Sequence, residues 1–427
     1  MPGRWRLIVL ILPVLLLAPD AAAPGVVPDR PMRVAFIDTL APANPWRGYV
    51  LGAMHAAASD LGIELTHHPV GHWPGDILER ARQVMTGPGK PDYLLVSIHR
   101  GIGTRLLELS QETHVPVFVF NSGLLPEDAA RVGGPRGHFP LWLGQLLPDE
   151  EDAGQLLARL LLEAATRGRA PGSPVGLVAI EGRLGDSSAL RRTAGLGRAV
   201  AAWEGASLLQ GVSASWDAEQ AWRKAALLLR RYPQLQVLWA ANDNMALGAL
   251  RAAEEAGRRP GEDFWVGGID WTPAALQAVR EGRMVTTLGG HFLEGAWALV
   301  LLHDYHRGRD FASEGLDWRT AMAPVSRDNV DALLQWLEER DFESIDFRAF
   351  SKAANPALTH YDFSLRAVFA QRRLRFPGTL LELYGHARPL PLERQPARPP
   401  AAPGHRPLQP RRQPRQHQRA ARRRLPR

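Results

Sequence analysis

Short, continuously apolar segments alternate with amphipathic segments of helical spacing from residue 33 to residue 288. The apolar segments, such as Tyr93–Ser97 and Val175–Ile180, do not alternate apolar with polar side chains. Continuous apolar strands indicate burial on both faces, as in a parallel sheet that is covered by helices. Repeated strand–helix–strand units of this length predict a doubly wound α/β fold, with room for two such units that divide near residues 146–149. The predicted strands are 33–40, 63–67, 93–97, 115–120, 175–180, 207–210, 237–241, 264–269 and 285–288.

The charge of the chain is concentrated near its C-terminal end. The formal net charge of +7 is the sum of +11 on residues 388–427, which hold 12 Arg and the single acid Glu393, and −4 on the rest. The body is mildly acidic, which argues against a nucleic-acid-binding protein. Residues 388–427 are rich in Pro, Arg and Gln without an apolar period, and we predict a disordered basic tail. The chain holds 0 Cys, which excludes disulfides, thiolate metal sites and Cys nucleophiles.

The first residues have the pattern of a secretory signal peptide. Arg4 and Arg6 precede the apolar run Leu7–Leu17, and Ala21–Ala23 supply small residues for cleavage. The run is shorter than the roughly 20 residues that span a bilayer. We therefore predict that residues 1–23 direct export to the periplasm and that the mature protein is soluble; the alternative is an uncleaved membrane anchor.

Polar side chains follow the ends of many predicted strands. In an open α/β sheet, ligands bind beyond the carboxyl ends of the strands. A hydroxyl-rich ligand fits these residues, because carboxylates and amides hydrogen-bond adjacent hydroxyls and aromatic faces pack on the C–H face of a sugar ring. Helix capping would explain any one of them but not the set. The nine candidate site residues are Asn44, Trp46, Arg47, Asn121, Arg192, Trp216, Asn242, Asp270 and His291, and Trp271 adds a further tryptophan at a strand end.

Three polar residues stand together at Asn242–Asn244, between an apolar strand and a helical segment. We predict that Asp243 caps the helix, because Asp is a preferred N-cap residue. We predict that Asn242 points into the ligand cleft and that Asn244 faces solvent.

The known catalytic motifs are absent. The first strand is not followed by G-x-G-x-x-G, and neither G-x-S-x-G nor H-E-x-x-H occurs. Nor does any spaced pair of His with a carboxylate suggest a metal centre. We therefore predict no catalytic residue, no metal and no cofactor. An enzyme remains the weaker alternative, with candidate bases His67, His68, His72, His99 and His291.

Four motifs carry a resemblance to a known family: NPWRGYV at 44–50, SSALRRTAG at 187–195, ANDNMALGA at 241–249 and GGIDWTP at 267–273. Over Arg33–Pro324 the chain resembles the type I periplasmic binding proteins of the ribose-binding and Lac-repressor-core group, the substrate-binding components of ABC sugar transporters. The resemblance implies two parallel-sheet lobes joined by a hinge, which close on a ligand without doing chemistry.

The resemblance also implies ligand contacts. Trp216 would stack on the sugar, and Asn242 and Asp270 would hydrogen-bond its hydroxyls. The other implied contacts are Asn44, Trp46, Asn121, Arg192 and His291. Arg47 stands where ribose binders carry a second aromatic residue, and Asn121 replaces a common aspartate. A more anionic ligand, or one that is not a sugar, is therefore an alternative to a neutral sugar.

The predicted organisation follows from the resemblance and from composition. An N-terminal lobe would hold residues 33–146 and 290–317, and a C-terminal lobe residues 147–289 and 318–325. Residues 328–376 are predicted to form a helical extension, because Leu333, Leu334, Trp336 and Leu337 share a helix face.

The leading hypothesis is a monomeric, extracytoplasmic solute-binding protein that captures a sugar-like molecule and presents it to a membrane permease. The alternative is a periplasmic receptor that signals through a membrane sensor kinase or cyclase. A transcriptional repressor of this fold would need a helix-turn-helix before the first strand, where this chain has its predicted signal peptide.

Overall fold

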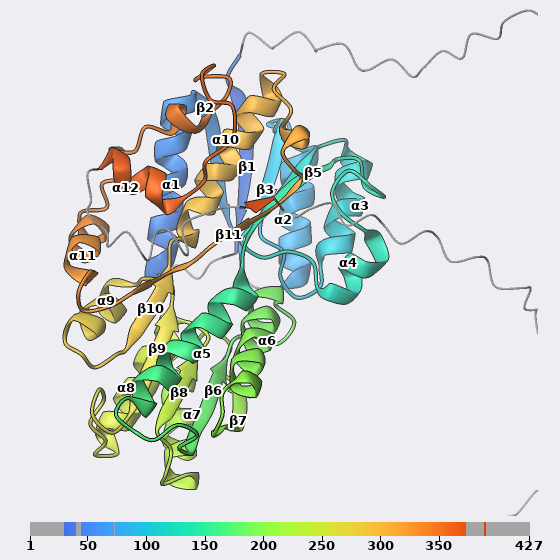
Figure 1. The fold of residues 1–427 in the computed structure, drawn as a ribbon. Coiled ribbons are helices and arrows are strands. Elements are labelled where there is room, and N and C mark those ends of the chain that lie inside the picture. The colour runs from blue at the N-terminus through green and yellow to red at the C-terminus, as the bar shows by residue number, and fades with distance from the viewer. Residues whose placement is uncertain (1–29, 40–43, 72, 373–387, 390–427) are drawn as a thin grey trace, which may run out of the picture. The chain divides into compact units, whose positions relative to one another are not determined.

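The structure is a computed structural model that describes residues 30–39, 44–71, 73–372 and 388–389. The predicted signal peptide, and the predicted tail from residue 390 onward, lie outside these residues. The described chain forms two α/β lobes, each built on a mainly parallel sheet (Figure 1), as the sequence predicted.

The first lobe is built on a seven-stranded sheet with the order β13-β11-β5-β4-β3-β1-β2. Neighbouring strands are parallel, except that β13 is antiparallel to β11. β3 and β4 are buried along their whole length, which accounts for their continuous apolar sequence. The strands are β1 Met32–Asp38, β2 Ile63–Pro69, β3 Tyr93–Val96, β4 Val117–Phe120, β5 Trp142–Pro148, β11 Asp317–Thr320 and β13 Arg388–Pro389.

Helices cover both faces of this sheet. Val34 and Phe36 of β1 pack in one apolar cluster with α1 and α10, whereas Ala35 and Ile37 pack in a second cluster with α2 and α3. This division follows from the alternation of side chains along a strand. The helices of the lobe are α1 Pro45–Leu61, α2 Pro74–Thr86, α3 Gly103–Thr113, α4 Pro126–Val132 and α10 Glu294–His306, with the 3-10 turn η2 Phe311–Ser313.

The second lobe is built on a six-stranded sheet with the order β12-β10-β9-β8-β6-β7, in which only β12 is antiparallel to its neighbour. Its strands are β6 Val175–Glu181, β7 Ala206–Ser213, β8 Val237–Ala240, β9 Trp265–Ile269, β10 Thr286–Gly289 and β12 Ala323–Val325. Its helices are α5 Glu150–Thr166, α6 Ser187–Ala202, α7 Ala218–Arg231, α8 Asp243–Glu255 and α9 Pro273–Arg280.

Two glycines let α5 and α6 pack at very short range. A Cβ on Gly154 would lie 2.0 Å from the carbonyl oxygen of Arg192, and one on Gly195 would lie 1.9 Å from the carbonyl oxygen of Glu151. Only glycine permits this approach. The packing sets the second and third turns of α6 against the start of α5, where the buried ion pair of Arg192 and Glu150 forms.

The chain passes between the lobes three times: from β5 to α5, from β10 through the 3-10 turn η1 His291–Leu293 to α10, and from β11 to β12. The predicted placement of residues 318–320 in the C-terminal lobe is wrong, because β11 pairs with β5 of the first sheet. Residues 323–325 lie in the second sheet, where β12 pairs with β10.

The extension after β12 is less helical than predicted. It contains α11 Val330–Glu339, the 3-10 turn η3 Phe347–Phe350 and α12 Leu365–Gln371, joined by irregular segments. α11 packs against α9 of the second lobe. Phe342 packs on Tyr49 of α1, and both Phe342 and Trp336 pack on Phe292 of η1. The extension therefore contacts both lobes and one of the crossings between them.

A buried carboxylate anchors the extension to the first lobe. Asp304 of α10 is fully buried and accepts hydrogen bonds from Ser351 Oγ at 2.5 Å, Lys352 N at 2.6 Å and Tyr361 Oη at 2.9 Å. Burial alone would raise the pKa of Asp304, but hydrogen bonds from His303, Ser351 and Tyr361 lower it below its ordinary value. The charged carboxylate of Asp304 thus holds the irregular segment between η3 and α12 on the first lobe.

The first two residues of the predicted tail belong to a sheet. Arg388 and Pro389 form β13 on β11, so these two residues are not disordered. An edge strand offers unpaired backbone groups, and a short extended segment satisfies them.

Candidate functional site

A cavity of about 750 Å³ lies where the carboxyl ends of the two sheets meet. Its lining includes residues that follow β1, β3, β4 and β5 of the first lobe and β6 to β10 of the second. Eight of the nine site residues predicted from the sequence lie in this lining: Asn44, Trp46, Asn121, Arg192, Trp216, Asn242, Asp270 and His291.

Arg47, the ninth predicted residue, is not part of the lining. Its Nε donates to Asp38 Oδ2 at 2.6 Å, and its Nη2 lies 3.2 Å from His67 Nε2. Asp38 is fully buried at the end of β1 and needs a positive partner. The first turn of α1 thus directs Arg47 toward β1 and β2, and the structure does not bring it together with the other predicted site residues.

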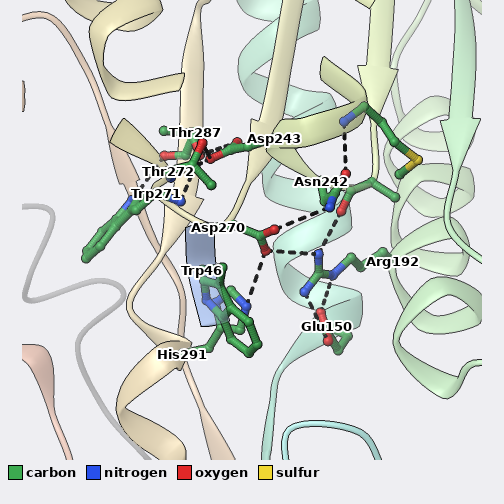
Figure 2. Close-up of polar contacts among 12 residues, drawn as sticks. Trp46, Glu150, Arg192, Asn242, Asp243, Asp270, Trp271, Thr272, Thr287 and His291 are labelled. Carbon is green, nitrogen blue, oxygen red and sulfur yellow. Dashed lines mark hydrogen bonds and ion pairs between the residues drawn. The ribbon is translucent and has the colours of Figure 1, made fainter. Parts of the chain in front are cut away.

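A buried ion pair forms one wall of the cavity (Figure 2). Arg192 Nε donates to Glu150 Oε2 at 2.5 Å and Arg192 Nη2 to Glu150 Oε1 at 3.2 Å, so the contact is bidentate. Arg192 Nη1 donates to the carbonyl oxygen of Ala241 at 2.7 Å and lies 3.8 Å from Asp270 Oδ1. Arg192 thereby joins α5, α6, the end of β8 and the end of β9.

The cap of α8 is Asn242 and not Asp243, contrary to the prediction. Asn242 Oδ1 accepts from Met245 N at 3.0 Å, and its Nδ2 donates to Asp270 Oδ2 at 3.4 Å. Asp243 is fully buried and accepts from Thr272 N at 2.8 Å and Thr287 Oγ1 at 2.7 Å (Figure 2). Asp243 therefore ties the ends of β8, β9 and β10 together.

Asn244 and Trp271 also differ from expectation. Asn244 was expected to face solvent, but it lines the cavity and is half-buried. Trp271, a candidate from its place after β9, is fully buried and donates from Nε1 to the carbonyl oxygen of Thr287 at 3.2 Å. Trp271 is thus a core residue outside the lining.

Two aromatic groups face the cavity from opposite lobes. Trp46 stacks on His291 with ring centroids 4.9 Å apart and planes at 28°. Trp216 donates from Nε1 to Asp186 Oδ2 at 2.9 Å, and Arg192 lies over its ring at 5.8 Å from the centroid. A flat apolar surface is thus held firmly on each side of the polar groups.

Backbone strain is concentrated around the cavity. Five lining residues that are not glycine have a φ in the left-handed region, which costs free energy for such residues. They are Arg100 (51°), Asn121 (62°), Ser215 (55°), Trp216 (68°) and Asp270 (132°). Strained backbone of this kind is typical of functional sites, because it aims side chains where unstrained geometry does not.

Burial governs the protonation of the cavity's ionisable groups. Burial lowers the pKa of His291 to about 3, and the charge of Arg192 adds to this shift, so the imidazole is neutral at pH 7. Burial raises the pKa of Asp270, which Arg192 and the hydrogen bond from Asn242 oppose. Burial also raises the pKa of Asp243, and the charge of Asp270 adds to that shift. The two carboxyls therefore resist carrying two negative charges.

Several lining residues were missed from the sequence. Glu150 follows β5, a strand that the apolar pattern did not reveal. His99, which the sequence suggested only as a candidate base, and Arg100 follow β3, and applying the strand-end rule to that strand would have found both as lining residues. The others are Thr39, Arg183, Asp186, Ser188, Ser215, Asp217, Ala218, Gln220 and Asn244.

The lobes touch beside the cavity. Ser122 Oγ of the first lobe lies 3.1 Å from Ser187 Oγ of the second, and Gly123 N donates to the same oxygen at 3.2 Å. His99 Nδ1 lies 3.6 Å from Asp186 Oδ1 across the same boundary. The structure thus has the lobes in contact on this side.

Within the described ranges, no helix is both long enough and apolar enough to cross a membrane. In the same part of the chain, no group of three or more His, Cys, Asp or Glu side chains is arranged to hold a metal ion. The lining instead offers amides, carboxylates, three guanidinium groups and tryptophan faces, which suit a small polar ligand that carries hydroxyl groups.

Comparison with known proteins agrees with this geometry. Residues 40–310 match the periplasmic binding protein domain. A periplasmic sugar-binding protein from Pseudomonas fluorescens of known crystal structure is 33% identical, with a TM-score of 0.71, over 79% of this chain and 99% of its own.

Two further relatives match over shorter segments. The xylitol-binding protein of Mycolicibacterium smegmatis is 26% identical over 223 residues, which are 52% of this chain and 57% of that protein. The ribose import binding protein of Salmonella typhimurium is 36% identical over 112 residues, 26% of this chain and 36% of that protein. The matches thus span less than two thirds of either relative. From the domain match and the solved relative, the chain belongs to the periplasmic binding protein family and has its type I fold.

Proposed function

We propose that this protein is an extracytoplasmic solute-binding protein that captures a small sugar-like molecule between its two lobes. The observation that carries the proposal is the cavity at the carboxyl ends of both sheets, where Asn242, Asp270 and Arg192 offer hydrogen bonds between the faces of Trp46 and Trp216. Relatives named as binding proteins for ribose and for xylitol support a hydroxyl-rich ligand.

Ligand capture proceeds by hinge motion about the three crossings between the lobes. The closed form is presented to the permease of an ABC transporter in the periplasm, and the ligand is released unchanged. The neutral imidazole of His291 and the Asp270 carboxyl serve as hydrogen-bonding groups and not as an acid–base pair.

The test is a panel of pentoses, hexoses, polyols and sugar acids, screened by thermal shift and followed by calorimetry. At least one member is expected to stabilise the folded protein and to reduce its radius of gyration in small-angle X-ray scattering. A folded protein that no member of a broad panel stabilises would contradict the proposal.

Variants locate the site once a ligand is found. Asp270→Ala and Trp216→Ala are each expected to weaken binding by about 1–3 kcal/mol, from lost buried hydrogen bonds or stacking. The control is Asp76→Ala, an exposed carboxylate in the first turn of α2, outside the lining. Unchanged affinity in both cavity variants would refute the site assignment.

The partner is tested separately by the neighbouring genes. Genes for a permease and an ATPase beside this one would support uptake. A histidine kinase or cyclase gene in their place would contradict the transport role and leave ligand capture standing.

A further inference from the structure

Two arginines face the mouth of the cavity from opposite lobes. Arg100 follows β3 of the first lobe and Arg183 follows β6 of the second, and both line the cavity. The loop that carries Arg183 approaches Arg100 closely, since a Cβ on Gly185 would lie 3.8 Å from the Cα of Arg100. Neither residue was among the site residues predicted from the sequence.

Within the part of the chain that the structure describes, only one carboxylate, that of Asp186, lies within ion-pair distance of this pair. Among the described residues, no carboxylate lies within ion-pair distance of Arg100, whose guanidinium instead lies 5.6 Å from the ring centroid of Trp73. Arg183 makes no hydrogen bond to the residues that the structure describes, and its Nη1 lies 3.5 Å from Asp186 Oδ2. That same carboxylate oxygen already accepts from Trp216 Nε1 at 2.9 Å.

The other carboxylates of the lining are also engaged by donors of the chain. Glu150 accepts from Arg192, Asp270 from Asn242 and Asp217 from the backbone N–H of Gln220. Each carboxylate of the lining therefore already accepts at least one hydrogen bond from the chain. An anion from outside would meet two guanidinium groups with most of their donors free.

The surroundings make this arrangement costly without such an anion. Burial lowers the pKa of Arg183, and the charge of Arg100 lowers it further, although Asp186 opposes both. Arg100 also sits at a φ of 51°, in the left-handed region that a residue with a side chain rarely adopts. Two positive charges are thus held near each other, Arg100 on a strained loop and Arg183 on a half-buried loop.

We propose that Arg100 and Arg183 form an anion subsite at the mouth of the cavity, which takes a carboxylate or phosphate group carried by the sugar-like ligand. This inference rests on the proposed function and narrows its ligand class to anionic sugar derivatives. Guanidinium groups bind carboxylate and phosphate oxygens through paired N–H donors. An anion between the lobes would also bind both of them at once and favour their contact.

The size of the cavity leaves space for such a group. A single sugar ring displaces on the order of 200 Å³ if each hydroxyl-bearing carbon takes about the 30 Å³ of a water molecule. The cavity of about 750 Å³ is several times larger. The cavity therefore has room for a sugar ring beside Asp270 and Arg192 together with a charged group at the two arginines. From the sequence, an anionic ligand was an alternative because of Arg47. Arg100 and Arg183 now support that alternative in place of Arg47.

The experiment compares matched ligand pairs by calorimetry on the full chain: D-glucose with D-glucuronate, and D-ribose with D-ribose 5-phosphate. Inorganic phosphate alone is the third probe. We expect the anionic member of at least one pair to bind about tenfold or more tightly than its neutral parent. This advantage should shrink as NaCl is raised, because part of it is screened.

The variants are Arg100→Gln, Arg183→Gln and the double variant, with Arg80→Gln as control. Arg80 is exposed on α2 of the first lobe and lies outside the lining. The double variant should bring the anionic and neutral ligands within about twofold of each other. The control should keep the full difference.

The outcomes separate this inference from the proposed function. If neutral sugars bind and depend on Asp270, while their anionic partners gain nothing, the anion subsite is refuted and the proposed function stands. An anionic advantage that survives in the double variant also refutes the subsite. If no sugar, neutral or anionic, binds the folded protein, both the anion subsite and the proposed function are refuted. Stabilisation by phosphate that Arg100→Gln and Arg183→Gln abolish supports the subsite.

Discussion

Removing one partner of the buried Arg192–Glu150 pair should destabilise the protein more than removing both. The two side chains are 5% and 3% exposed and share two hydrogen bonds. Arg192→Met leaves the Glu150 carboxylate buried without its counter-ion. The double variant Arg192→Met with Glu150→Gln leaves no orphaned charge there.

The magnitude follows from burial and geometry. Two unit charges about 4 Å apart attract by about 4 kcal/mol at an effective dielectric constant of 20, and breaking such a pair costs about 3–5 kcal/mol. Arg192→Met should therefore lower the free energy of unfolding by about 3–5 kcal/mol. The double variant should lose only about 1–2 kcal/mol, chiefly for the unpaired carbonyl oxygen of Ala241. Asp270, near the lost guanidinium, can bind a proton because burial already raises its pKa.

The assay is denaturant unfolding at pH 7 without ligand, followed by tryptophan fluorescence and by circular dichroism so that coincident transitions can be checked. A double variant that is as unstable as Arg192→Met would refute the reasoning, since the loss would then come from packing and not from orphaned charge. A single variant as stable as the wild type would refute it equally.

Three further predictions concern stability. Gly195→Ala should cost about 1–3 kcal/mol because its Cβ would meet backbone of α5, whereas Gly197→Ala, with nothing within 4 Å, should stabilise α6 by up to about 1 kcal/mol; equal denaturation midpoints would contradict this. His291→Gln should reduce the loss of stability as pH falls from 6.5 toward 3. The reason is that the unfolded wild-type imidazole binds a proton over this range, whereas the folded imidazole, with a pKa of about 3, does not. Variant and wild-type proteins whose unfolding curves shift equally between pH 7 and pH 4 would contradict this expectation. Burial raises the pKa of Glu294 well above 4.5, so folding favours its protonated form and stability is lost as pH rises from 4.5; Glu294→Gln should flatten that decline, and an unchanged slope would argue against it.

The repeating pattern of the chain was sufficient to predict the two lobes, because parallel strands buried on both faces have a distinctive apolar sequence. β5 escaped detection since Gly144 and Gln145 interrupt its apolar run. In the structure both positions are enclosed by neighbours from β4 and β11. Glu150 was missed in consequence, because no strand end was recognised before it.

The sequence predicted those lining residues whose position follows from the end of a recognised strand. The rule that ligands bind beyond the carboxyl ends of strands identified eight lining residues, but it could not say which way each side chain turns. Asn242 and Asp243 are both good helix caps. Asp243 does not cap α8 because it accepts hydrogen bonds from Thr272 and Thr287, which are distant in sequence. Arg47 turns away because buried Asp38 needs its charge.

The extension that follows β12 has a consequence for ligand affinity. Its aromatic side chains and Asp304 fasten it to the first lobe, while α11 packs on α9 of the second, with Asp331 Oδ1 3.0 Å from Arg280 Nε. If the lobes rotate as proposed, an extension that is fastened to both of them must change its contacts with at least one lobe, and those contacts then differ in free energy between the open and closed forms. Apparent affinity scales with the population of the competent form, at about tenfold for each 1.4 kcal/mol. The sensitivity of this protein to its ligand can therefore be adjusted from the outer side of the hinge, with every residue of the cavity left as it is.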